Sequence, residues 1–92
     1  MTMYPYLKSV EALNDYQLAL EFQNGERRIF DMKPYLSRGI FIRLQNPALF
    51  QAAAVVAGSV EWPDGLDLSY DTLYLESPPA EAAASEMAEA VL

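Results

Sequence analysis

The chain has 92 residues, of which 52% are hydrophobic, and a formal net charge of −7. It contains neither histidine nor cysteine. These two side chains most often supply a base, a nucleophile or a soft metal ligand near neutral pH. Their absence excludes Ser-His, Cys-His and thiolate-zinc chemistry within one copy. Length and apolar content predict one folded domain. We therefore expect a non-enzymatic protein without catalytic, cofactor-binding or metal-binding residues.

Charge is distributed unevenly along the chain. Residues 1–43 hold all six basic side chains together with five acidic ones, whereas residues 44–92 hold eight acidic side chains and no basic one. Binding to a phosphate backbone requires clustered lysine and arginine, so we expect no direct contact with nucleic acid. The acidic half favours a basic protein partner. The simpler alternative is a solvated acidic surface that keeps a small protein in solution.

The N-terminus shows no basic segment followed by an apolar run, so we expect no signal peptide. No apolar stretch approaches the roughly 18 residues that a membrane-spanning helix requires. We therefore expect no membrane contact. The lack of cysteine is typical of a reducing compartment, and the predicted location is the cytoplasm.

The first third of the chain predicts a three-stranded antiparallel meander. Residues 6–13 form a loosely patterned strand, and residues 16–22 alternate apolar and polar side chains with the period of a half-buried strand. Asn24-Gly25 predicts a type I′ turn, which needs positive φ at both central positions. Residues 26–30 should return as the antiparallel partner.

Short helical segments are predicted in the middle of the chain. Asp31 is a candidate N-cap for a helical turn that ends at Gly39. Residues 40–44 are interpreted as a connecting segment, either strand or turn. Asn46 followed by proline predicts a helix over residues 48–52, with the asparagine as its cap.

The next segment predicts further strands and one more helical turn. Residues 53–57 and 60–62 have the composition of strands, and residues 63–65 that of a turn. Residues 67–74 predict a short strand followed by a helical turn capped by Ser69.

Residues 80–92 are rich in alanine and glutamate, with Met87 and Val91 four residues apart. Such a segment has high helix propensity but is marginally stable alone, so it either frays or orders on a partner. We expect a single α+β domain over residues 1–77 and a helical or frayed tail over residues 78–92. The predicted fold is a small antiparallel sheet with one or two short helices.

These features carry a resemblance to a known family. The most specific residues are Trp62-Pro63-x-Gly65-x-Asp67-Leu68-Ser69 before Leu73-Tyr74, followed by Phe30-Asp31 near the end of the meander. The chain resembles the domain of unknown function 2442 family of short bacterial proteins from Tyr4 to Glu76. The resemblance implies a small α+β fold, and in some members fusion to a helix-turn-helix or an encoded neighbour that looks like a toxin. It implies no catalytic residues.

Two groups of side chains are candidates for contact with a partner. Arg27 and Arg28, with Lys33 and Arg38 nearby, are best interpreted as exposed strand-edge charges that discourage edge pairing. A predicted interaction surface comprises Trp62, Asp64, Asp67, Tyr70, Asp71 and Met87. For the tryptophan, a core position with its N–H bonded to a loop carbonyl is favoured over an exposed contact. The spacing of the three aspartates does not match a calcium loop, so turn-forming and helix-start roles are preferred.

Two functions follow as hypotheses. The first is a non-enzymatic protein-interaction module, antitoxin-like in binding a basic, nuclease-like partner. The alternative is a sensory or dimerising domain related to those of transcription regulators, which would bind a small ligand or form a homo-oligomer.

Overall fold

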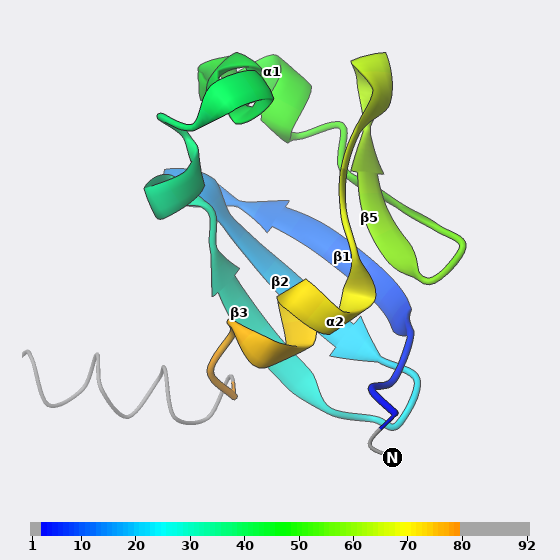
Figure 1. Cartoon of the computed structure of the whole chain (residues 1–92). Coiled ribbons are helices and arrows are strands. Elements are labelled where there is room, and N and C mark those ends of the chain that lie inside the picture. The colour runs from blue at the N-terminus through cyan, green and yellow to red at the C-terminus, as the bar shows by residue number, and fades with distance from the viewer. Residues whose placement is uncertain (1–2, 80–92) are drawn as a thin grey trace, which may run out of the picture.

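The computed structural model describes residues 3–79, which form two small antiparallel sheets and several short helices (Figure 1). The α+β prediction is therefore confirmed, although the second half of the chain forms a sheet of its own. The first sheet has the order β1-β2-β3 and the second the order β4-β5-β6. The strands are β1 (Leu7–Leu13), β2 (Gln17–Phe22), β3 (Arg27–Asp31), β4 (Ala54–Val56), β5 (Ser59–Trp62) and β6 (Leu66–Leu68).

The predicted meander is present, with β2 as its central strand. Leu18, Leu20 and Phe22 are buried, while the residues between them are half-buried, as the alternating pattern predicts. Tyr16 does not extend this strand. It ends a 3₁₀ turn, η1 (Asn14–Tyr16), with a φ of 58°. Its hydroxyl donates to the Gln45 carbonyl and its ring meets that of Phe50 edge-on, which holds a bulky residue in a disfavoured conformation.

The prediction of a type I′ turn at Asn24-Gly25 is wrong. Only Gly25 has a positive φ, 89°, and the Gly25 N–H donates to the Phe22 carbonyl at 2.9 Å. This is a three-residue hairpin loop closed by a left-handed glycine. The Asn24 side chain accepts from the Glu26 N–H at 3.0 Å, which favours this loop over the two-residue turn. The two-residue connection with two positive φ values joins β4 to β5 instead, at Ala57 (52°) and Gly58 (81°).

The middle of the chain is more helical than predicted. The 3₁₀ helix η2 (Lys33–Tyr35) has Met32 at its N-cap position, and Asp31 instead accepts from the Lys33 N–H at 3.0 Å. Gly39 begins the next helix and does not end the previous one. Residues interpreted as strand or turn form the 3₁₀ helix η3 (Gly39–Gln45).

Two short α-helices complete the described residues. The first, α1 (Pro47–Phe50), has Asn46 at its cap as predicted, and the Asn46 side chain accepts from the Ala48 N–H at 3.0 Å. The second, α2 (Tyr70–Leu75), has Ser69 at the N-cap position. The predicted cap bond is wrong, because the Ser69 hydroxyl donates to Asp71, whose carboxylate accepts from the Thr72 N–H at 2.9 Å.

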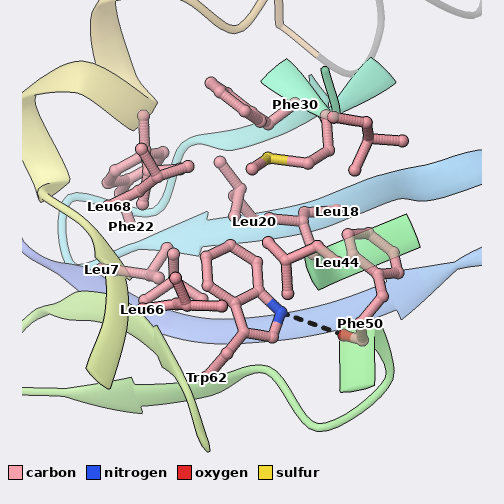
Figure 2. Close-up of a cluster of buried hydrophobic side chains, with 14 residues drawn as sticks. Leu7, Leu18, Leu20, Phe22, Phe30, Leu44, Phe50, Trp62, Leu66 and Leu68 are labelled. Atoms are coloured by element: carbon pink, nitrogen blue, oxygen red, sulfur yellow. Dashed lines mark hydrogen bonds between the residues drawn. The ribbon is translucent and has the colours of Figure 1, made fainter. Parts of the chain in front are cut away.

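A single core joins the two sheets and the helices (Figure 2). Side chains from β1, β2 and β3 meet Leu44 of η3, Phe50 of α1 and Leu73 of α2. Trp62 lies in the middle of this core, 2% exposed, and its indole N–H donates to the Phe50 carbonyl at 3.1 Å. The predicted core position of the tryptophan is thus confirmed, but its N–H bonds to a carbonyl at the end of α1 and not to a loop carbonyl.

A comparison of Gly58 with Gly25 distinguishes the stability cost of a close contact from the cost of a left-handed backbone conformation. An added Cβ would lie 2.8 Å from the Tyr6 Cβ, whereas Gly25, also at positive φ, has open space around it. We expect Gly25→Ala to lower the free energy of unfolding by about 1–2 kcal/mol for its left-handed backbone. Gly58→Ala should cost about 1–3 kcal/mol more, because the Tyr6 side chain must move. Urea unfolding of both variants measures the difference, and equal costs would contradict this contact.

Candidate interaction surfaces

Among residues 3–79, the predicted interaction residues are distributed over several different elements. Trp62 is buried and offers no surface, which corrects its place in the predicted set. Tyr70 is half-buried, and its ring packs edge-on against Tyr6 with centroids 4.7 Å apart. Met87 lies outside the described residues. What remains of the predicted set is three exposed aspartates.

The three aspartates lie on three separate elements. Asp64 forms a turn with a φ of 70° and stands 3.9 Å from an Arg43 nitrogen. Asp67 lies on β6, and Asp71 lies in the first turn of α2. Two hydrogen bonds lower the pKa of the Asp71 carboxyl below its ordinary value. The Ser69 hydroxyl has the larger effect and the Thr72 N–H the smaller. Within residues 3–79, no group of three or more acidic side chains is placed to hold a metal ion.

The second sheet nevertheless presents an acidic surface of its own. Glu61 on β5 pairs directly with Asp67 on β6, and Ala54 on β4 pairs with Glu61. We call the outward-facing residues Ala54, Val56, Glu61 and Asp67 the acidic face. Val56 is 47% exposed. Like charges directly opposite on neighbouring strands are unfavourable for sheet stability. Glu61 alternates with the buried Val60 and Trp62, so its outward direction follows from the strand pattern in the sequence.

Four of the six basic side chains are paired with acidic side chains elsewhere. In the described part of the chain, Lys8, Arg28 and Lys33 pair with acids of the first sheet and its turns, and Arg43 pairs with Asp64. Neither Glu61 nor Asp67 has a cationic nitrogen within ion-pair distance among residues 3–79. The described residues therefore leave the acidic face without an internal counter-charge.

A second surface is the outward side of the first sheet. Among residues 3–79, the second sheet and the helices η2, η3, α1 and α2 contribute to the core on the opposite, inner side, which carries Leu18 and Leu20. The outward side holds an open concavity of about 530 Å³. We call its outward-facing residues the open face: Ser9, Glu11, Ala19, Glu21, Arg27 and Ile29. Sequence reasoning missed this surface, because its residues look like the polar side of an ordinary strand.

Arg28 links β3 to the end of α2 and is not the exposed edge charge that was predicted. Its side chain is 16% exposed, and its guanidinium stacks on the Tyr74 ring at 4.0 Å. It donates to the carbonyls of Tyr74 at 3.3 Å and Ser77 at 2.7 Å. Two further nitrogens donate to Glu26 at 3.0 and 2.8 Å. The planar five-donor group of arginine suits this arrangement, whereas lysine would satisfy only part of it.

Glu26 makes this cluster sensitive to acid. The Arg28 side chain first, and the Tyr74 hydroxyl second, hold the pKa of the Glu26 carboxyl below its ordinary value. A lowered folded-state pKa stabilises the fold above the unfolded-state value of about 4.3, and this contribution is lost as pH falls through the folded-state value. We expect Glu26→Gln to lower the urea midpoint at neutral pH and to flatten its fall at acidic pH. Glu11→Gln, an exposed change on β1, is the control, and the same flattening in it would refute the assignment.

Comparison with known proteins places the chain in a family. No helix within the described ranges has the length and apolarity needed to cross a membrane. No curated protein and no solved structure matches the chain. Residues 7–79 match the family model described as a protein of unknown function, DUF2442. This range includes both sheets, the Arg28 cluster and the acidic face, and it confirms the resemblance seen in the sequence. The chain belongs to the DUF2442 family of proteins of unknown function.

Proposed function

We propose that this chain is a non-enzymatic interaction module of the cytoplasm whose acidic face binds a basic protein. The observation that carries the proposal is the pair of opposed carboxylates, Glu61 and Asp67, left without an internal counter-charge by any described residue. Such a pair costs the folded protein stability on its own, and a cationic partner would remove that cost.

The composition supports an interaction role and not a catalytic one. With neither imidazole nor thiol in the chain, general-base and nucleophilic chemistry would fall to carboxylates, hydroxyls and the two lysine amines. The hydroxyls of Ser69 and Ser77 are taken up in hydrogen bonds to Asp71 and to the Leu73 carbonyl. These bonds organise the ends of α2.

More specifically, the basic partner would be nuclease-like, and this chain would act like an antitoxin. A nuclease binds its substrate through lysine and arginine side chains that neutralise phosphates. Carboxylates on neighbouring strands lie about 5 Å apart at their Cβ atoms and present negative charge at a fixed spacing. The acidic face would then occupy the phosphate-binding surface of a nuclease-like partner. Its exposed Val56 would add an apolar contact beside the charges.

Affinity purification from the native cell, with co-expression of the protein encoded next to the gene, supplies the partner. We expect Glu61→Gln combined with Asp67→Asn to weaken the complex at least about tenfold, because hydrogen bonds to charged groups contribute about 1.5–3 kcal/mol each. Binding should also weaken steeply with added salt, as electrostatic association does. Titration calorimetry at two ionic strengths measures both effects.

The matched control is Glu11→Gln combined with Glu21→Gln, which removes the same charge from the open face. The proposal requires this control to bind like the unmodified chain. Equal weakening by both double variants would assign the effect to net charge alone. A captured partner without a basic surface would contradict the proposal.

A further inference from the structure

Three of the four outer strand edges in the described part of the chain are covered. The edges of β1 and β4 lie beside each other, and the Leu7 N–H donates to the Gly58 carbonyl at 2.8 Å. The outer edge of β3 is covered by Pro78 and Pro79. β6 is the last strand of the second sheet, and no backbone hydrogen bond joins its outer side to another described residue. Among residues 3–79, the open edge is therefore that of β6.

The turn between β4 and β5 determines which backbone groups point out of this edge. In a two-residue hairpin the residues that flank the turn, here Val56 and Ser59, exchange backbone hydrogen bonds. Hydrogen-bonded and non-hydrogen-bonded pairs alternate along antiparallel strands. Glu61 therefore bonds toward β4 and forms a non-hydrogen-bonded pair with Asp67, in which side chains lie closest. The N–H and carbonyl of Asp67 point away from β5, into the open edge.

Ser69 adds a further donor to this edge. Asp67 and Ser69 are exposed, whereas Leu66 and Leu68 are buried in the core. Ser69 continues the extended backbone of β6, with φ −72° and ψ 154°. Successive N–H groups of an extended chain point in opposite directions, so the Ser69 N–H lies on the same side as that of Asp67. An added strand would find two donors and one acceptor here.

We propose that an extended basic segment of the partner adds to β6 as the fourth strand of the second sheet, an inference that rests on the proposed function. A residue opposite Asp67 would form a hydrogen-bonded pair with it, and its side chain would lie on the acidic face. A lysine or arginine there lies next to Asp67 and extends toward Glu61, one strand farther. Side chains two residues apart share a face, so the segment would alternate basic residues with others.

The same charges disfavour a second copy as the occupant. Two β6 edges paired antiparallel about their midpoints would put the Asp67 side chains of both copies directly opposite each other. Like charges at opposed positions destabilise a sheet, and the Glu61 of each copy would lie one strand away. A basic segment replaces this repulsion with attraction. The carboxylates thus protect the open edge from self-association and select the charge of the strand that can add.

Methylated peptides distinguish backbone pairing from charge attraction. The probe is the acetylated and amidated peptide Arg-Val-Arg-Val-Arg, titrated into the isotope-labelled full chain at low salt. We expect it to shift the amide NMR signals of Asp67 and Ser69 and to protect the Asp67 amide from exchange with water. The arginine N–H groups face β6 in the proposed register and the valine N–H groups face away. N-methylation of the arginines should therefore weaken binding at least about tenfold more than N-methylation of the valines, at equal charge.

A pair of variants tests the edge from the side of the protein. The φ of Ser69 suits proline, so Ser69→Pro removes the outward N–H and the hydroxyl, whereas Ser69→Ala removes the hydroxyl alone. We expect Ser69→Pro to bind the peptide about two- to tenfold more weakly than Ser69→Ala, which is the loss of one hydrogen bond. Amide spectra of both variants without peptide verify that they fold. Equal affinities would contradict the added strand.

Failure of this inference and failure of the proposed function give different results. The added strand is overturned if the unmodified peptide does not bind, if both methylated peptides bind equally, or if Asp67 amides of two copies contact each other. The proposed function would still stand if a captured partner required Glu61 and Asp67. Conversely, methylation-sensitive binding that Glu61→Gln with Asp67→Asn leaves unchanged would support strand addition and refute charge recognition by the acidic face.

Discussion

The structure depends on burying one side of a three-stranded meander. Leu18, Leu20 and Phe22 point inward from β2, and the other five strands, η2, η3 and both α-helices contribute side chains to the same core. A small sheet has little stability alone, because it needs a second layer to exclude water from its apolar side. The second layer here is assembled from short pieces, and Trp62 joins them. The indole fills the space among the two sheets and α1 and also donates its N–H to the α1 backbone (Figure 2).

Much of this arrangement was predictable from residue patterns. The alternation over β2 located the inner side of the first sheet, and Asn46-Pro47 located the start of α1, because both signals act locally. The prediction failed where tertiary contacts decide the conformation. The alternating pattern predicts Tyr16 as the first strand residue. Its ring instead packs against Phe50 and its hydroxyl donates to the Gln45 carbonyl, and these contacts hold its backbone at a positive φ outside the strand. Residues 40–44 were ambiguous, since a short apolar run does not distinguish strand from helix.

The interaction surfaces were harder to predict than the fold. The acidic half of the chain was visible in the composition, but its use depends on which carboxylates find a cation after folding. Asp64 lies near Arg43, and Asp71 accepts from a backbone N–H in the first turn of α2. Strand pairing brings Glu61 and Asp67 together. The pairing of Glu61 with Asp67 follows from the burial of Val60 and Trp62 on the other side of the second sheet. This burial can be predicted only when the side chains that cover that side are known. Similarly, Arg28 and Glu26 look like ordinary hairpin charges until α2 returns to β3.

The two prolines that follow Ser77 have a consequence for solution behaviour. β3 is an outer strand, and an outer strand of a flat sheet is a template on which other chains can add and polymerise. Pro78 supplies an acceptor to this edge, but neither proline has an N–H with which to continue the ladder outward. Just before the prolines, the Arg28 guanidinium donates to the Tyr74 and Ser77 carbonyls, and its charge persists across the physiological pH range. The chain thereby blocks the strand that would otherwise favour fibril growth, and a protein without disulfides gains resistance to aggregation.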